Sequence, residues 1–401
     1  MIIMEKKNDK LMNILFVSMY QVSEQKGGTE RTTARLSNEL RKRGHRCYNL
    51  YKKSIDSSFE ITDFDGIYSQ CSAIAIADIL DKHSIDKIII EGAFVLVENT
   101  YKGRLLSKQK PFIYFVHHFA PGYEPYFNAF YSLKKQFLFS LILSNKVKAL
   151  AKILIYLVYK PYMDKRFHRL YKTTYEQCDK IILLSSSYKE DYCRFGGLTD
   201  KSKFTSIPNA VSFDDFLDFQ YIPRKQNTVL IVSRFDEVQK RISLALQIWK
   251  LIETDKDLFG WELKLVGFGE SESDYKEQVK SLNLKHVSFE GKQNPVKYYK
   301  NSSLFMMTSL FEGWPMTLNE SLQFGCIPIV YDTCASFHEI IIQGENGYLV
   351  TDGDERMFYL TMKKLMLDTG NRKIMSQKAI ESSKRFTLDK IVNQWENLLN
   401  D

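Results

Sequence analysis

Cysteine is scarce in this chain and shows no paired spacing. The 401 residues contain six cysteines, without a C-x-x-C pair and without the Cys and His spacing of a zinc site. The pattern excludes a disulfide framework and a structural zinc module, and it favours reduced thiols packed in a core. The cysteines are Cys47, Cys71, Cys178, Cys193, Cys326 and Cys334.

The chain also lacks an unbroken apolar run of the roughly 20 residues that a membrane-spanning helix needs. The longest candidate, QFLFSLILSNKVKALAKILIYLVY, is interrupted by Lys146, Lys148 and Lys152. The amino-terminal stretch MIIMEKKNDKLMNILFVS has no long apolar segment before a cleavage site, and its run MNILFVS has the length of a strand. We therefore expect a cytoplasmic protein that is not exported.

The positive charge is concentrated in one segment. The formal net charge is +8, and residues 131–172 contain ten Lys or Arg against one acid, Asp164. A helix with lysines on one side and apolar residues on the other could lie peripherally on an anionic membrane surface, at the inner face of the cell membrane. The alternative is a helical hairpin packed on its own domain with a solvated basic face. The segment carries no motif that reads RNA or DNA, so no nucleic-acid partner is expected.

Apolar runs of strand length alternate with helix-length segments, beginning with NILFVS at 13. This alternation indicates the α/β class, with parallel sheets wound on both faces by helices. The plan occurs twice without a sequence period, which predicts two Rossmann-like doubly wound domains facing a central cleft. The expected parts are residues 1–207, a polar linker with two prolines at 208–227, residues 228–382, and a last helix at about 383–401 that packs back on the first domain.

A G-x-G-x-x-G fingerprint is missing, which disfavours a nicotinamide dehydrogenase. Two glycine-containing loops remain. KGGTE has Gly27 and Gly28 at the start of a predicted helix, where backbone can approach a phosphate closely. GFGES has Gly267 and Gly269 but no third glycine.

The stretch RFDEVQKRISLALQIWKLI follows the predicted strand TVLIVS directly. Its apolar stripe predicts a helix, with Arg234, Lys240 and Arg241 in the entry loop and at the amino end. Cations there oppose the helix dipole, at a cost of roughly 0.3 to 1 kcal/mol each, unless an anion lies between them. A phosphate or diphosphate would satisfy both the cations and the free backbone N–H groups. A solvated basic turn is the alternative interpretation.

The stretch FEGWPMTLNES places two glutamates around a turn that enters a helix. Thr317 and Glu320 form the T-x-x-E pattern of a capping box, and Pro315 suits a helix entrance. Glu312 follows the predicted strand SLFMMTS, at the edge of a parallel sheet where ligands bind. A carboxylate there can accept hydrogen bonds from sugar hydroxyls, and a second one further along the helix could reach a ribose.

These pieces together resemble a known family. The run from Glu312 to Glu320 resembles the E-x7-E motif of family-4 retaining glycosyltransferases with the GT-B fold. The GG-T-E loop, the glycine and histidine at 44, IPNAV at 207, LVGFGE at 265, ENGYLV at 345 and the spacing of Arg234 and Lys240 occur in the family's order. Met316, Ser321 and a serine before Arg234 depart mildly from its pattern.

The resemblance implies roles for individual residues. Glu312 would bind hydroxyls of the donor sugar and Glu320 the nucleotide ribose. Arg234 and Lys240 would neutralise the donor diphosphate and stabilise its charge as it leaves.

Further donor contacts are implied around these residues. His117, at the end of the strand-like run YFVHHF, matches the family's cleft histidine, and His118 leaves the register open by one residue. Loops at 267 and 291 would contact the base. The remaining implied donor-binding positions are Gly27, Gly28, Gly267, Gly269, Gly313, Trp314, Pro315, Met316, Thr317 and Leu318.

The implied activity is transfer of a glycosyl group from a nucleoside-diphosphate sugar to a saccharide with retention of configuration. The first domain would bind the acceptor, a saccharide or a polyprenyl-linked saccharide in bacterial surface polysaccharide or glycoconjugate assembly, and the second the donor. No D-x-D motif stands at a strand end in the cleft, so no metal and no other cofactor is expected. A nucleotide-sugar epimerase of the same architecture and a non-enzymatic basic binding protein are the alternatives.

Overall fold

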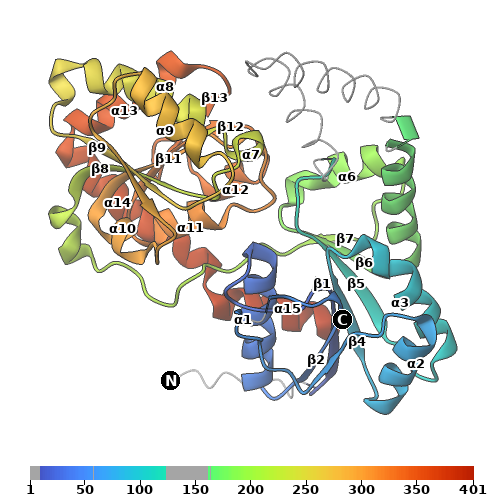
Figure 1. Ribbon diagram of the computed structural model, residues 1–401. Coiled ribbons are helices and arrows are strands. Elements are labelled where there is room, and N and C mark those ends of the chain that lie inside the picture. Colours follow the sequence, from blue (N-terminus) through green and yellow to red (C-terminus); the bar gives the residue numbers. More distant parts are fainter. Residues whose placement is uncertain (1–9, 57, 123–160, 163) are drawn as a thin grey trace. The chain divides into compact units, whose positions relative to one another are not determined.

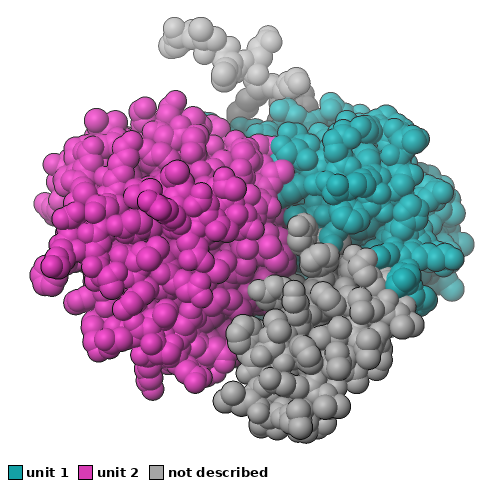
Figure 2. Space-filling view, turned by 90° about the horizontal axis from the view of Figure 1, so that it is seen from above, with its two compact units in different colours: residues 1–122, 160–210, 388–401 teal, residues 123–159, 211–387 magenta. Residues whose placement is uncertain are grey.

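The computed structural model describes residues 10–56, 58–122, 161–162 and 164–401 (Figure 1). These residues form two compact units, which Figure 2 shows in different colours. Unit 1 consists of the described parts of residues 1–122, 160–210 and 388–401, and the described part of unit 2 is residues 211–387. The chain therefore passes between units after Ala210 and after Thr387.

Unit 1 is built on a seven-stranded parallel sheet with the order β3-β2-β1-β4-β5-β6-β7. The order reverses direction between β1 and β4, which is the point where such sheets bind ligands. The strands are β1 (Asn13–Tyr20), β2 (Arg46–Lys53), β3 (Gly66–Tyr68), β4 (Lys87–Glu91), β5 (Phe112–His117), β6 (Lys180–Leu183) and β7 (Phe204–Ser206).

The strands of this sheet are buried where their sequences are continuously apolar. In β1, residues 14–18 are all buried, as expected for a strand that helices cover on both faces. The short edge strand β3 has no such run, and its residues are exposed or half-buried. Strand β3 could not be predicted from sequence, because three residues with one central isoleucine give no periodic signal.

Helices lie on both faces of the unit 1 sheet, with α2 and α3 packed together on one face and α1 and α15 on the other (Figure 1). Their bounds are α1 (Gly28–Lys42), α2 (Ala73–Lys82), α3 (Phe94–Leu106), α6 (Lys189–Gly196) and α15 (Leu388–Asn400). The 3-10 helix η1 (Ser186–Tyr188) precedes α6. Ser72 caps α2 by accepting a hydrogen bond from the Ala75 N–H, and Gly197 ends α6 in the left-handed conformation.

The last helix, α15, returns to unit 1 and packs on α1. It buries Ile391, Val392, Trp395 and Leu399 on its apolar side. At its polar edge Arg43 pairs with Glu396 and with Asp389, both at 2.6 Å. Apolar burial therefore fixes the helix on the sheet, while these charges set its register along α1.

Unit 2 contains a six-stranded parallel sheet with the order β10-β9-β8-β11-β12-β13. Its direction reverses between β8 and β11, so the segments that follow these two strands leave the same edge side by side. The strands are β8 (Gln226–Val232), β9 (Glu262–Val266), β10 (Val287–Gly291), β11 (Ser302–Met307), β12 (Ile327–Asp332) and β13 (Tyr348–Thr351).

The helices of unit 2 cover a large apolar core in which Trp249 of α8 is fully buried. They are α7 (Glu237–Lys240), α8 (Ile242–Thr254), α9 (Glu272–Ser281), α10 (Val296–Asn301), α11 (Met316–Gln323), α12 (Phe337–Ile340), α13 (Glu355–Leu367) and α14 (Thr369–Ser383). Three 3-10 helices, η2 (Phe219–Arg224), η3 (Lys256–Leu258) and η4 (Lys384–Phe386), complete the unit.

No helix in the described part of the chain is long and apolar enough to cross a membrane. Most of the basic segment 131–172, whose alternatives are a membrane-surface helix and a packed hairpin, lies outside the described residues. All six cysteines are free thiols, and only Cys71 is not fully buried.

The packing of α15 leads to a prediction about stability. Trp395→Ala removes a buried indole and is expected to lower the free energy of unfolding of unit 1 by about 3 to 5 kcal/mol, because a cavity remains. Gln394→Ala, at an exposed position of the same helix, is the matched control. Urea unfolding followed by circular dichroism measures both, and equal midpoints for the two variants would contradict the packing described.

Candidate active site

The loop after β8 carries Arg234 and leads into the short helix α7. The Asp236 carboxylate caps α7 by accepting hydrogen bonds from the Val238 and Gln239 N–H groups at 3.0 and 3.4 Å. The Glu237 carboxylate accepts from the Ser243 N–H at 3.1 Å and from its hydroxyl, and so caps the next helix, α8. The prediction that an anion would take the free N–H groups of α8 is therefore wrong for Ser243.

Arg241 also differs from its predicted setting. It lies between α7 and α8 in the left-handed region, with φ at 48°, and is buried. Its guanidinium donates to the Thr308 carbonyl at 2.8 Å and pairs with both carboxylate oxygens of Asp352, at 2.6 and 3.2 Å. Arg241 thus links the junction of α7 and α8 to the segments that follow β11 and β13, and its charge is already compensated.

Lys240 and Glu312 form the central contact of this region. The Lys240 Nζ lies 2.5 Å from Glu312 Oε1, and their side chains are only 14% and 9% exposed. The Glu312 N–H donates to the Cys334 Sγ at 3.0 Å, and burial raises the pKa of the Cys334 thiol to about 12. The structure therefore brings together two residues that are 72 positions apart in the sequence and were both predicted to act on the donor.

Arg234 reaches the same pair through Gln239. Its Nη2 donates to Gln239 Oε1 at 3.1 Å, and Gln239 Nε2 donates to the Phe311 carbonyl at 3.1 Å and to Glu312 Oε2 at 3.4 Å. Arg234 itself is exposed. The cations Arg234 and Lys240 and the Glu312 carboxylate thus lie together at the edge of the sheet, and Arg234 is the cation exposed to solvent.

Helix α11 begins beside Glu312 without a side-chain cap. Pro315 occupies the N-cap, and its carbonyl accepts from the Leu318 and Asn319 N–H groups. The N–H groups of Met316 and Thr317 have no partner among the described residues. The positive end of the helix dipole is therefore available to an anion.

The predicted capping box is not formed. Thr317 makes no cap bond. Glu320 is buried, and its oxygens accept from the Ser212 hydroxyl at 2.5 Å and the Tyr299 hydroxyl at 2.9 Å. Glu320 is thus held by Ser212, which precedes η2 in the chain, and by Tyr299 of α10. No local sequence pattern could identify these residues as its partners.

Around α11, Trp314 packs edge-on against Phe386 with ring centroids 5.2 Å apart. Its indole N–H is buried and has no hydrogen-bond partner among the described residues. Gly313 lies between Glu312 and this tryptophan, in the turn that aims α11 at the edge of the sheet.

Gly267 and Gly269 have a structural reason to be glycine. A Cβ on Gly267, whose φ is 145°, would lie 1.8 Å from the Ser233 carbonyl oxygen, and one on Gly269 would lie 2.5 Å from the Phe235 carbonyl oxygen. The Phe235 N–H donates to the Phe268 carbonyl at 2.8 Å. These glycines let the loop after β9 pack closely against the loop that carries Arg234. Their contacts with the nucleotide-sugar donor stay a prediction.

In unit 1, Gly27 and Gly28 lie at the start of α1. Gly27 is the N-cap in an extended conformation, and a Cβ there would lie 2.8 Å from a carboxylate oxygen of Glu30. Space is open around Gly28. Close approach of a ligand is thus sterically possible at Gly28, as its predicted role requires.

His117 lies in an aromatic core, and its predicted contact with the donor sugar stays a prediction. It is buried among aromatic rings, with centroids 5.3 to 6.4 Å away. Burial, with a smaller contribution from His118, lowers the pKa of His117 to about 3. The surrounding rings belong to Phe94, Phe115, Tyr171 and Tyr192.

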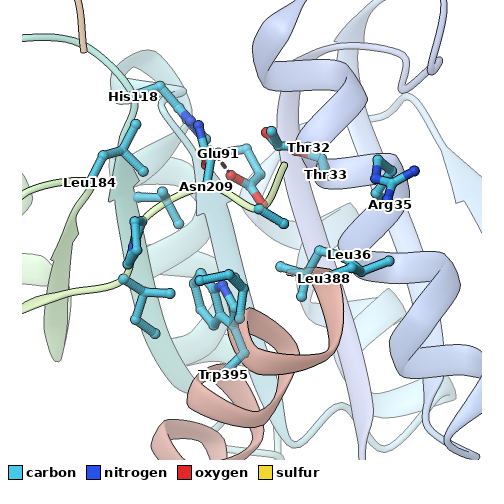
Figure 3. Close-up of a pocket in the computed structure, with 15 residues that line it drawn as sticks. Thr32, Thr33, Arg35, Leu36, Glu91, His118, Leu184, Asn209, Leu388 and Trp395 are labelled. Atoms are coloured by element: carbon cyan, nitrogen blue, oxygen red, sulfur yellow. Dashed lines mark hydrogen bonds and ion pairs between the residues drawn. The ribbon is translucent and has the colours of Figure 1, made fainter. Parts of the chain in front are cut away.

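His118 is the histidine that lines a cavity (Figure 3). Its Nε2 lies 2.6 Å from Glu91 Oε2, at the carboxyl ends of β4 and β5. Thr32 and Arg35 of α1 and Trp395 of α15 line the same cavity, whose volume is about 30 Å³. The structure therefore places the second of the two histidines at the edge where ligands bind.

This arrangement defines a class of protein. Two α/β units with parallel sheets, and a cationic edge beside a carboxylate in the second, match glycosyltransferases of the GT-B fold. A profile described as Glycosyltransferase Family 4 matches residues 26–215, and one described as Glycosyl transferases group 1 matches residues 213–382. The chain belongs to the family-4 glycosyltransferases.

Relatives and solved structures agree with this assignment. The chain is 31% identical over 179 residues to the amylovoran biosynthesis glycosyltransferase AmsD of Erwinia amylovora, covering 44% of this chain and 49% of the relative. It is 28% identical over 232 residues, 57% of this chain and 62% of the relative, to the GalNAc-alpha-(1->4)-GalNAc-alpha-(1->3)-diNAcBac-PP-undecaprenol alpha-1,4-N-acetyl-D-galactosaminyltransferase of Campylobacter jejuni. The matches thus span about half to three fifths of these relatives.

The fold is similar to that of Anabaena Alr3699/HepE in complex with UDP. The TM-score is 0.69 at 16% sequence identity, and the alignment covers 97% of this chain and 99% of that chain. This likeness shows the fold. The contacts of Gln239, Ser212, Tyr299 and Cys334 were not predicted from sequence, although Gln239 lies between Arg234 and Lys240 and Ser212 lies in the predicted linker 208–227.

The buried position of His117 leads to a prediction about pH. The pKa of His117 is about 3 in the folded chain and about 6.5 when unfolded. Between these values the unfolded chain binds the extra proton, so stability falls as pH falls. At pH 6.5 the unfolded imidazole is already half protonated, so from pH 6.5 to 5 the loss is about 1.6 kcal/mol, and the slope approaches about 1.4 kcal/mol per pH unit only at the lower end.

The measurement is the urea unfolding of unit 1 at several pH values. His117→Gln should flatten the dependence below pH 6.5, while His286→Gln, at an exposed histidine, should leave it unchanged. A His117→Gln variant with the slope of the natural protein would contradict the buried, neutral imidazole.

Proposed function

We propose that this chain is a retaining glycosyltransferase that moves a sugar from a nucleoside-diphosphate sugar to a saccharide acceptor. The observation that carries the proposal is the grouping of Arg234, Lys240 and Glu312 beside the uncapped start of α11. The cations and N–H groups suit a diphosphate, and the carboxylate suits sugar hydroxyls. The UDP complex of the similar fold supports a nucleotide donor.

In this proposal the donor rearranges the charges of the site. The diphosphate lies against Arg234, Lys240 and the N–H groups of Met316 and Thr317, and it relieves Lys240 of its pairing with Glu312. The Glu312 carboxylate, released from Lys240, then accepts hydrogen bonds from donor hydroxyls, and Glu320 contacts the ribose by exchanging one of its bonds to Ser212 and Tyr299. Preorganised cations and dipoles stabilise the charge that develops on the departing diphosphate.

The reaction breaks the bond between the anomeric carbon and the diphosphate oxygen, and forms one to the acceptor oxygen. In this proposal the acceptor proton leaves with the nucleoside diphosphate. The reaction needs no metal, since Arg234 and Lys240 supply the charge that compensates the diphosphate. The anomeric configuration is retained.

The acceptor we propose is a saccharide, and specifically one linked to polyprenyl diphosphate. The name of the Campylobacter relative includes a diphospho-undecaprenol saccharide, and that of the Erwinia relative includes amylovoran biosynthesis. The proposed setting is therefore bacterial surface polysaccharide assembly in the cytoplasm, at the inner face of the cell membrane. Segment 131–172 is the proposed contact with anionic lipid.

The test of the activity is release of nucleoside diphosphate and transfer of labelled sugar to lipid-linked saccharides. Incubation of UDP-sugars without acceptor separates the alternatives, since an epimerase converts the sugar while a transferase does not. A protein that neither binds nor consumes any nucleotide sugar would contradict the proposal.

Substitution of the proposed diphosphate-binding residues leads to a prediction. Lys240→Met and Arg234→Met each remove a cation and are expected to lower kcat/KM for the donor by about 100- to 1,000-fold. The control Lys276→Met removes an exposed lysine of α9 that pairs with Glu272, and it should retain activity. Turnover of Lys240→Met within threefold of the natural protein would overturn the assignment of roles.

A further inference from the structure

Gln239 connects residues that the proposed function assigns to different parts of the donor. Its Oε1 accepts from Arg234 at 3.1 Å, while its Nε2 donates to the Phe311 carbonyl and to Glu312 at 3.1 and 3.4 Å. The Gln239 carbonyl also accepts from the Leu310 N–H at 2.7 Å. Both the backbone and the side chain of this one residue therefore hold the segment that carries Glu312.

The chemistry of the amide explains why a glutamine suits this position. A guanidinium only donates hydrogen bonds, and an ionised carboxylate only accepts them. A side chain that joins the two must accept at one end and donate at the other. A glutamate here could not donate to Glu312, and a lysine could not accept from Arg234, so neither would reproduce the connection.

The connection also fixes the orientation of Glu312. Lys240 contacts its Oε1 and Gln239 contacts its Oε2. When the diphosphate takes Lys240 away from Glu312 in the proposed mechanism, the Gln239 bond remains. The carboxylate then stays in place for the sugar without the lysine.

We infer that Gln239 is a positioning residue that couples diphosphate binding at Arg234 to sugar binding at Glu312. This inference rests on the proposed function. Its distinctive consequence is that Gln239 acts on both the binding and the turnover of the donor without touching the reacting atoms. A residue that serves only the stability of unit 2 would have no such effect at temperatures where the protein is folded.

The first experiment compares steady-state kinetics of Gln239→Met and Gln239→Glu. Gln239→Met removes both side-chain connections, and kcat should fall by about ten- to a hundredfold because Glu312 is no longer held in place. Gln239→Glu keeps the acceptor for Arg234 but places a second carboxylate against Glu312. It should therefore also weaken binding of UDP, GDP or ADP, whichever the natural protein binds, measured by titration calorimetry.

Gln278→Met is the matched control. The Gln278 side chain, on α9 in the same unit, donates to the Ser243 backbone carbonyl at 2.9 Å. It should leave kcat and nucleotide binding unchanged. Values of kcat and KM for Gln239→Met within twofold of the natural protein would overturn the inference.

A second measurement does not depend on activity. Hydrogen–deuterium exchange of residues 310–313 should become faster in Gln239→Met and stay unchanged in Gln278→Met, because the first variant releases the Phe311 carbonyl and the Glu312 carboxylate. Unchanged exchange in Gln239→Met would overturn the inference even if the enzyme transfers sugar. Faster exchange in a protein that binds no nucleotide would support the positioning role while rejecting the proposed function.

Discussion

The ion pair between Lys240 and Glu312 is the interaction on which the site depends. It exists because β8 and β11 are neighbours at the point where the unit 2 sheet reverses its order. The segments after these strands leave the same edge, so residues far apart in the sequence meet with little exposure to water. In such a setting the cation and the carboxylate stabilise each other, since a buried charge without a partner raises the free energy of the folded state.

The pair also gives the site a resting state. Lys240 is compensated by Glu312, Arg241 by Asp352, and Arg234 is held by Gln239 in solvent. A diphosphate can replace Glu312 on Lys240 at small electrostatic cost, because one anion substitutes for another. The exposed arginine and the uncapped start of α11 then add the binding free energy that the resting ion pair does not supply.

Sequence alone predicted the architecture because parallel strands that are buried on both faces give long apolar runs. Through their positions after such runs it singled out Arg234, Lys240 and Glu312, which the structure brings together, while their action on a donor stays a prediction. It did not find β3, which has no apolar run. It left the amino end of α8 open for an anion, whereas Glu237 caps it through Ser243. It offered a capping box for Glu320, whereas Glu320 bonds Ser212 and Tyr299, partners that tertiary packing brings to it.

The two histidines also show that a local sequence pattern does not reveal a side chain's tertiary surroundings. His117 and His118 are adjacent, so one step along a strand end decides which imidazole enters the aromatic core and which meets Glu91. Side chains alternate between the two faces of a strand, and a sequence without the sheet's surroundings does not say which face is which. The surrounding rings of Phe94 and Tyr171, which settle it, come from α3 and a distant helical segment.

The most direct measurement of the central claim is a crystal structure of the full chain with a bound nucleoside diphosphate. The account predicts that the phosphates lie between Arg234, Lys240 and the N–H groups of Met316 and Thr317, with the Lys240–Glu312 distance increased from 2.5 Å. Phosphates bound elsewhere, with Lys240 still paired to Glu312, would contradict it.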